Sequence, residues 1–257
     1  MPANYHTHTF RCHHAVGEDR EYVEAAIAAG YDVLGFADHV PWVYPDDYVS
    51  PTRMTAAETE DYFTSLTALK KEYAGDITIY IGFESEYLPE LLPAQDRLLA
   101  DYPVDYMILG QHFVTPEPYG HYTGFDGDLE GLVAYTDSVI EGMETGRYIY
   151  TAHPDLYRYR GEGTEKQFRR ICRYMKEKEL PVEINILGIA TGRHYPSSLF
   201  LNIAAEEGCS AIIGVDAHDP KVFERSGILL RGTEIAEKFG LPVVDYMPGL
   251  GRLKEAT

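Results

Sequence analysis

Cysteine and long apolar runs are scarce in this sequence, and each scarcity excludes a class of protein. The chain has only three cysteines, Cys12, Cys172 and Cys209, and this odd, widely spaced set predicts neither a disulfide framework nor a thiolate zinc site. No uncharged apolar run is long enough to span a membrane. The histidines that begin at His6 leave no room for a signal peptide. We therefore expect a cytoplasmic protein without a membrane partner.

Basic side chains are also few. Lys and Arg number 22 against 41 Asp and Glu, which gives a formal net charge of -19. A nucleic-acid-binding surface needs basic patches that neutralise phosphates, so we expect no nucleic-acid partner. Such an acidic chain can bind an anionic substrate only where a buried positive charge reverses the local field.

Short apolar runs rich in β-branched residues alternate with longer helical patterns. The predicted strands are Ala3–His8, Asp32–Ala37, Ile77–Glu84, Val104–Gly110, Tyr148–Ala152, Val182–Ile186 and Ala211–Val215. The predicted helices cover residues 19–30, 55–74, 89–101, 129–146, 164–179 and 197–207. This alternation predicts an α/β fold with a parallel sheet buried on both faces. Seven units can close into a barrel, and an eighth apolar run, Leu241–Tyr246, leaves the strand count open. Because no linker or repeat interrupts the pattern, we expect one domain over residues 1–257.

Histidines and carboxylates follow these predicted strands one after another. In His6-Thr7-His8 an extended backbone directs both imidazoles to the same side, because strand side chains alternate. Other strands lead into Asp38-His39, Glu84, His112, His153, Glu183 with Asn185, and Asp216 with His218. Active sites of (β/α) barrels lie at the carboxyl ends of the strands, so we expect these side chains to meet there. One shared metal cluster explains why so many polar groups are predicted to be buried, since unpaired buried polar groups are costly.

Each of these residues also has a simpler interpretation. A single buried histidine such as His39 is more often a structural residue than a ligand, and Glu84 could pair with an arginine. His13 points away from His14 if that segment is extended, and His121 follows no strand, so neither is predicted to bind metal.

Eight short motifs occur in one order along almost the whole chain. They are H-x-H-T-x-x-C-x-H-A at 6–15, A-D-H at 37–39, G-F-E-S-E-Y at 82–87, G-Q-H-F at 110–113, A-H-P-D at 152–155, E-I-N at 183–185, R-H-Y-P-S at 193–197 and V-D-A-H at 215–218. In these motifs the chain resembles the polymerase-and-histidinol-phosphatase (PHP) family of metal-dependent phosphoesterases, in its histidinol-phosphate phosphatase branch. The resemblance implies a distorted, TIM-like (β/α)7 barrel with the active site at the carboxyl ends of the strands.

The resemblance also implies three divalent metal ions. Motif by motif, it assigns His6, His8 and Asp216 to the first ion and His112 and His153 to the second. In this assignment Glu84 bridges these two ions. The third ion is assigned to His14, His39 and His218. Nitrogen and oxygen ligands suit zinc, iron and manganese alike. Cys12 lies among these ligands in the sequence, and we expect it to be a structural thiol.

The reaction implied by the resemblance is hydrolysis of a small phosphomonoester, L-histidinol phosphate in histidine biosynthesis, by a metal-bridging hydroxide. Three dications, offset by Glu84 and Asp216, leave about four positive charges in the site, which reverses the field of an acidic protein. Glu84 and Asp216 are the central catalytic candidates. The proton for the leaving alcohol has three candidate donors, which are Asp38, Asp216 and a ligand histidine such as His218.

Substrate contacts are predicted from chemistry. Arginine binds phosphate oxygens in pairs, and the candidates near the site are Arg158, Arg160, Arg193 and, beside the last, His194. Histidinol carries an ammonium and an imidazole, so its pocket should offer carboxylates, for which Glu86, Asp155 and Glu183 are available.

Three functions are alternatives to a histidinol-phosphate phosphatase. A related phosphatase acting on another phosphorylated metabolite or on phosphotyrosine is the main alternative. A polymerase-associated exonuclease would need a basic strand-binding surface, which the acidity of the chain opposes. A non-enzymatic metal-binding protein would be expected to have lost ligands, and all nine are present.

Overall fold

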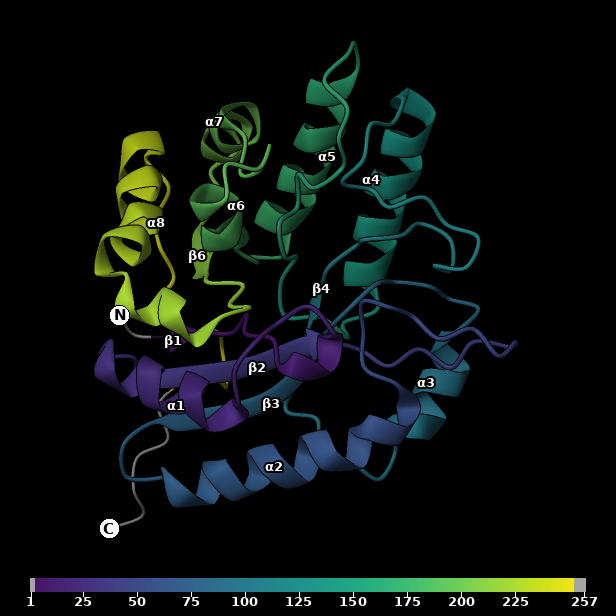
Figure 1. Ribbon diagram of the computed structural model, residues 1–257. Coiled ribbons are helices and arrows are strands. Elements are labelled where there is room, and N and C mark those ends of the chain that lie inside the picture. Colours follow the sequence, from purple (N-terminus) through teal and green to yellow (C-terminus); the bar gives the residue numbers. More distant parts are fainter. Residues whose placement is uncertain (1–2, 252–257) are drawn as a thin grey trace.

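A parallel β-sheet that curls around a central axis forms the middle of the protein (Figure 1). The computed structural model describes residues 3–251. The strands are β1 (Ala3–Asn4), β2 (Val33–His39), β3 (Thr78–Ser85), β4 (Tyr106–Leu109), β5 (Val182–Asn185) and β6 (Ala211–Gly214). Strands β1 to β4 pair in sequence order, β5 pairs with β6, and every pair is parallel.

Single bridges join these two groups of strands into a distorted barrel. Thr151 bridges in parallel to Leu109 of β4 and to Val182 of β5, and Thr7 bridges to Ala217 beyond β6. The first and last parts of the barrel therefore meet next to the metal-ligand motifs. The strand predicted at residues 148–152 is reduced to this one bridging position. The eighth apolar run contributes one further bridge, from Val243 to Ala211.

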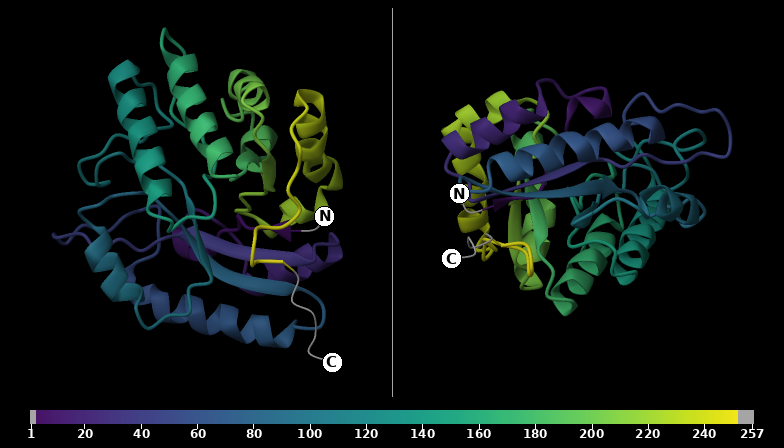
Figure 2. Two further views of the ribbon diagram at one scale, coloured as in Figure 1. Left: turned by 180° about the vertical axis from the view of Figure 1, so that it is seen from behind. Right: turned by 90° about the horizontal axis from the view of Figure 1, so that it is seen from below.

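Helices cover the outside of the sheet. They are α1 (Asp19–Ala28), α2 (Thr59–Glu72), α3 (Leu92–Leu99), α4 (Leu129–Glu144), α5 (Thr164–Glu177), α6 (Ile186–Ala190), α7 (Ser198–Glu206) and α8 (Ser226–Phe239), with 3-10 turns η1 (Phe10–Cys12), η2 (Ala56–Glu58) and η3 (Pro220–Glu224). Helices α1 and α2 lie alongside β2 and β3, whereas α4, α5, α7 and α8 stand side by side around the other half (Figures 1 and 2). The sequence predicted neither α6 nor α8. Within residues 3–251, no helix combines the length and apolarity needed to cross a bilayer.

The two longest strands explain where the site forms. Every residue of β2 and of β3 is buried, as expected for a parallel sheet covered on both faces. Both strands are apolar until their carboxyl ends, where β2 finishes with Asp38 and His39 and β3 with Glu84 and Ser85. Because the strands run in parallel and in register, with His39 opposite Glu84, these polar ends lie side by side at one end of the barrel.

Candidate metal centre

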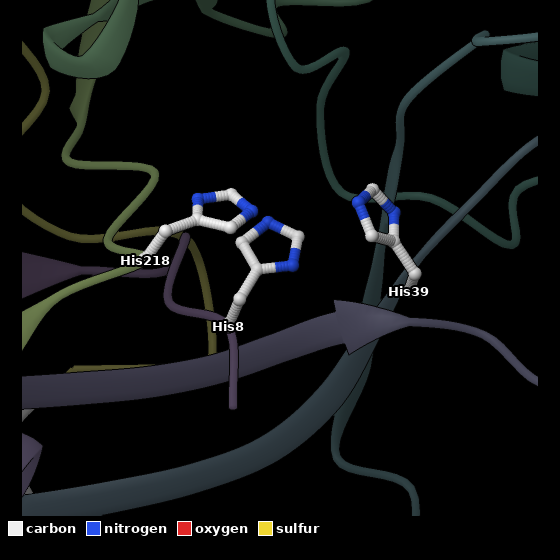
Figure 3. Close-up of side chains that lie close together, drawn as sticks. All are labelled: His8, His39 and His218. Atoms are coloured by element: carbon white, nitrogen blue, oxygen red, sulfur yellow. The ribbon is translucent and has the colours of Figure 1, made fainter. Parts of the chain in front are cut away.

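The nine predicted ligands converge at the carboxyl end of the barrel. Imidazole rings from distant segments stack or cross one another there, with centroids 4.0 Å apart for His8 and His218, 4.5 Å for His8 and His39, and 5.0 Å for His112 and His153. Figure 3 shows the rings of His8, His39 and His218 entering one space from three different segments. One ring nitrogen from each of these three residues lies within 4.8 Å of the other two.

Glu84 lies at the centre of this cluster, and its two oxygens face different histidines. Oε2 is 3.6 Å from Nε2 of His6 and 3.5 Å from Nε2 of His8. Oε1 is 3.5 Å from Nε2 of His112 and 2.8 Å from Nε2 of His153. A carboxylate flanked by two nitrogen pairs in this way can bridge two cations.

Asp216 completes the group around Oε2 of Glu84. Its Oδ1 atom lies 3.5 Å from Nε2 of His6 and 3.2 Å from Nε2 of His8. Asp216 adopts a left-handed backbone with φ of 53°. Residues other than glycine rarely take this conformation, and it costs about 1–3 kcal/mol where surrounding structure enforces it, most often at functional sites.

Six buried atoms of the predicted ligands make no well-aligned hydrogen bond within residues 3–251, although they lie close to one another. They are Nε2 of His6, Nε2 of His8, Nδ1 of His39, both carboxylate oxygens of Glu84 and Oδ1 of Asp216. Leaving such groups unpaired in the interior is costly, and the cost disappears if divalent cations lie among them. The residues present therefore fit a metal cluster, and their nitrogen and oxygen atoms suit zinc, iron or manganese.

The charges in the cluster agree with this interpretation. Burial opposes ionisation of Glu84, but the imidazoles of His112, His6 and His39 hold the pKa of its carboxyl well below its usual range. Burial also opposes protonation of His6, yet Glu183, Asp216 and Glu84 raise its pKa to about 10. Ionised carboxylates thus surround the imidazoles and favour positive charge in this space, which protons supply to the imidazoles or a divalent cation supplies in their place.

Buried carboxylates contact the Nδ1 atoms of three of the predicted ligand histidines. Nδ1 of His6 lies 2.7 Å from Oε1 of Glu183, and Nδ1 of His112 lies 3.2 Å from Oε1 of Glu86. Nδ1 of His8 lies 3.4 Å from Oδ1 of Asp38. Such carboxylate–imidazole pairs fix the tautomer, so that Nε2 faces the metal. The three carboxylates contact the histidines on the side away from the cluster.

A cavity of about 470 Å³ opens onto the cluster. Its walls include Glu84, Asp216 and His218 from the cluster, Phe113 and Tyr195 from two of the sequence motifs, and side chains that the sequence did not single out, among them Arg53, Glu117 and Tyr122. Arg53 comes from the long loop after β2, and Phe113, Glu117 and Tyr122 come from the loop after β4. Loops at this end of a barrel carry substrate contacts. The place of these residues in loops after predicted strands was therefore the available sequence signal for their role.

The four predicted phosphate-binding side chains lie in different places. Arg193 lines the cavity, and its Nη1 donates to the Tyr195 hydroxyl at 2.6 Å. Arg160 donates to three backbone carbonyls, those of Tyr157, Tyr159 and His194. Arg158 forms an exposed ion pair with Asp126. Nε2 of His194 lies within hydrogen-bond distance of the Leu156 carbonyl oxygen.

Comparisons with known proteins agree with the fold and identify the family. A probable histidinol-phosphatase of Deinococcus radiodurans is 29% identical over 226 residues, which cover 84% of this chain and 85% of the relative. A putative histidinol phosphatase structure from Listeria monocytogenes superposes with a TM-score of 0.70 at 23% identity, covering 85% of this chain and 96% of that one. The histidinol phosphate phosphatase of Lactococcus lactis, in complex with zinc, L-histidinol and phosphate, superposes with a TM-score of 0.71 at 19% identity over 95% of both chains. The PHP domain family model matches residues 4–186. The chain belongs to the PHP domain family.

Proposed function

We propose that this chain is a metal-dependent histidinol-phosphate phosphatase, which converts L-histidinol phosphate and water to L-histidinol and phosphate. One observation carries the proposal: a single cavity joins the unpaired ligand atoms around Glu84 to Arg193 and to a further carboxylate, Glu117. The ligand atoms around Glu84 suit a phosphate held by metal ions, and the Glu117 carboxylate suits an alcohol that carries positive charge. The names of the Deinococcus and Lactococcus relatives support the same substrate.

The metal centre in this proposal has three positions and nine ligands. His6, His8 and Asp216 hold one ion, Glu84 bridges it to the ion of His112 and His153, and His14, His39 and His218 hold the third. Bound divalent ions supply polarisation of the phosphoryl oxygens and activation of water near neutral pH. Zinc, iron and manganese all suit the nitrogen and oxygen donors. The three free thiols of the described chain suit a reducing compartment, and we place this single-domain enzyme in the cytoplasm.

Arg193 binds the phosphate in this proposal. Its guanidinium lies in the cavity wall and donates to Tyr195, which holds it in place. Arginine offers paired donors to phosphate oxygens, and a charge-assisted pair is about twice as strong as a neutral one. Arg158 and Arg160 are assigned no substrate contact, because an aspartate and backbone carbonyls already occupy them.

The proton for the leaving alcohol is assigned to His218. Burial opposes ionisation of Asp216, but His6, His218 and His8 hold the pKa of its carboxyl well below its usual range, so Asp216 has no proton to give. Both residues line the cavity, and Nδ1 of His218 lies 3.2 Å from Oδ1 of Asp216. Asp38, the third candidate, is buried behind His8, and its Oδ2 accepts from the Thr9 amide at 3.2 Å. We therefore give Asp38 the role of positioning His8.

Glu117 provides the negative charge for the cationic end of the substrate. Arg53 lies between two carboxylates, with Nη2 at 2.9 Å from Oε1 of Glu86 and Nε at 2.9 Å from Oε2 of Glu117. Burial opposes the charge on Glu86, but Arg53 and His112 lower its pKa to about 2. One guanidinium therefore faces two carboxylates, and Glu117 is the one of the two that lies in the cavity wall. An ammonium or imidazolium group is attracted to that wall, whereas a neutral alcohol is not.

The experiment that tests the proposal is a substrate panel with purified protein of known metal content. We expect L-histidinol phosphate to be hydrolysed with a higher kcat/KM than phosphotyrosine or neutral-alcohol phosphomonoesters. Glu117→Gln should raise KM for L-histidinol phosphate and leave KM for a neutral phosphomonoester unchanged, while Glu90→Gln at an exposed position changes neither. Faster turnover of another phosphomonoester, with negligible hydrolysis of L-histidinol phosphate, overturns the substrate and leaves a phosphatase.

A further inference from the structure

Cys12 lies against the third group of predicted ligands. Its side chain is fully buried. Its sulfur and one ring nitrogen from each of His14 and His218 all lie within 4.8 Å of one another, which is close enough for one cation to contact all three. The spacing of cysteines in the sequence predicted only a structural thiol at this position. The fold instead brings Cys12 to two histidines, one of which is more than 200 residues away along the chain.

The backbone explains why Cys12 and His14 face the same way. Turn η1 begins after Thr9, whose side chain accepts a hydrogen bond from the Arg11 amide, and ends at Cys12. His13 then takes a left-handed conformation with φ of 66°, and its ring points toward Glu58, with Nε2 3.6 Å from Oε2. The chain therefore turns sharply at His13, which places the residues on either side of it at the same site and His13 outside it.

Hydrogen bonds orient the two histidines toward a common point. Nδ1 of His14 lies 2.7 Å from the Cys12 carbonyl oxygen, and Nδ1 of His218 lies 3.1 Å from the Asp216 carbonyl oxygen. A neutral ring that donates its Nδ1 proton there keeps a lone pair on Nε2 for a cation. The two Nε2 atoms are 3.0 Å apart, a distance that one shared proton or one shared cation can span. Zinc–imidazole bonds are about 2.0–2.1 Å long, so a zinc ion bound to both nitrogens holds them about 3.0–3.4 Å apart.

We propose that the Cys12 thiolate is a ligand of the metal ion held by His14 and His218. The proposal rests on the metal centre proposed above, but not on its substrate. A thiolate is a soft ligand that selects zinc over manganese, and coordination deprotonates a thiol outright. This position therefore prefers zinc, although the nitrogen and oxygen ligands of the other two positions have no such preference. The thiolate also lowers the net charge of the cluster by one.

A second arrangement is available to the sulfur. Cys12 also lies with His8 and Asp38 in a group whose ligand atoms are within 4.8 Å of one another. A protonated thiol there would hydrogen-bond to these side chains and form no bond to metal. The two arrangements differ in one measurable respect, which is the presence of a metal–sulfur bond.

Cobalt(II) substitution of the full-length chain tests for that bond. The wild-type protein loaded with cobalt should show a near-ultraviolet thiolate-to-cobalt charge-transfer band, and Cys12→Ser should lose it. Cys172→Ser and Cys209→Ser are matched controls, because both cysteines are buried and lie near each other, with Cys209 Sγ 3.3 Å from the Cys172 carbonyl oxygen. Both controls should keep the band. Circular dichroism of each variant checks that it folds.

X-ray absorption of the zinc-loaded wild-type protein gives a result that needs no variant. We expect a sulfur neighbour at about 2.3 Å beside nitrogen and oxygen neighbours at about 2.0–2.1 Å. The proposal is overturned if the wild type shows neither the band nor the sulfur neighbour, or if Cys12→Ser keeps the band. An active histidinol-phosphate phosphatase without a metal–sulfur bond refutes this inference alone. A protein with the bond but without that activity refutes the proposed substrate alone.

Discussion

Replacing Glu183 with glutamine should weaken metal binding without changing substrate binding. The buried carboxylate of Glu183 accepts three hydrogen bonds, from Nδ1 of His6 at 2.7 Å, the His153 amide at 2.8 Å and Nδ2 of Asn185 at 3.0 Å. Glutamine has the same shape but only one acceptor oxygen, and its amide group is a donor. At least one of the three donors must then face another donor.

The size of the effect follows from these contacts. Removing the carboxylate behind a ligating imidazole lowers metal affinity about 10–100-fold, which corresponds to about 1.4–2.7 kcal/mol. Leaving one buried donor unsatisfied also lowers the free energy of unfolding by about 1–3 kcal/mol, a separate effect on stability. We expect the Kd for zinc at the His6 position to rise about 10–100-fold. At saturating zinc, KM should be unchanged, because Glu183 does not contact the substrate in the proposed arrangement.

Competition with a chromogenic chelator measures the zinc affinity, and activity measured against free zinc gives kcat and KM at saturation. Glu90→Gln is the matched control, since it removes the same charge at an exposed position. The sequence had offered Glu183 as a partner for the substrate ammonium. A higher KM at saturating zinc, with the zinc Kd unchanged, would support a substrate contact and refute the role of Glu183 in orienting His6.

Three further predictions concern the site and the core. Chelation of the metals should lower the Tm in calorimetry and zinc should restore it, because each ion at 100 times its Kd adds about 2.7 kcal/mol to the free energy of unfolding; an unchanged Tm contradicts the cluster. Gly110→Ala should lower the metal content, since the added Cβ overlaps Oε1 of Glu84, whereas Gly227→Ala, which meets open space, should not. Burial raises the pKa of Tyr5 from 10 to about 12, with the Met247 amide opposing it. The folded state thus favours the neutral phenol of Tyr5. This preference contributes fully to the free energy of unfolding below pH 10, and the contribution is lost as the pH rises toward 12. Tyr5→Phe should remove part of that loss in alkaline denaturation.

The longest strands were predictable because their signals are local. Runs of apolar residues gave β2 and β3 within one or two positions of their bounds, and His39 and Glu84 at their carboxyl ends meet, as expected, because parallel strands end together. Helix α8 was missed because it begins after Arg225 without a side-chain cap, so the usual signal for a helix start is absent. In place of the strand expected at residues 148–152, the structure has a single bridging position at Thr151.

The wall of the cavity was not predictable from local patterns. Glu117 lies in a loop and gains its position from contacts with Arg53, Ser50, Tyr48 and Tyr44, which precede it by 64 to 73 residues. Nothing near Glu117 in the sequence indicates these partners. The convergence of His39, Glu84 and Asp216, in contrast, was predictable because each lies at or just after the carboxyl end of a parallel strand.

The bridge between Thr7 and Ala217 has a consequence for how the protein is made. Synthesis delivers His6 and His8 first, but Asp216 and His218, which share their site, only after more than four-fifths of the chain. A nascent chain on the ribosome therefore exposes an incomplete set of imidazoles, able to capture whichever cation is abundant. The proposed metal centre can be complete only after translation has passed Ala217 and the barrel has closed. In that proposal, binding of ions to the full ligand set follows synthesis of nearly the whole chain.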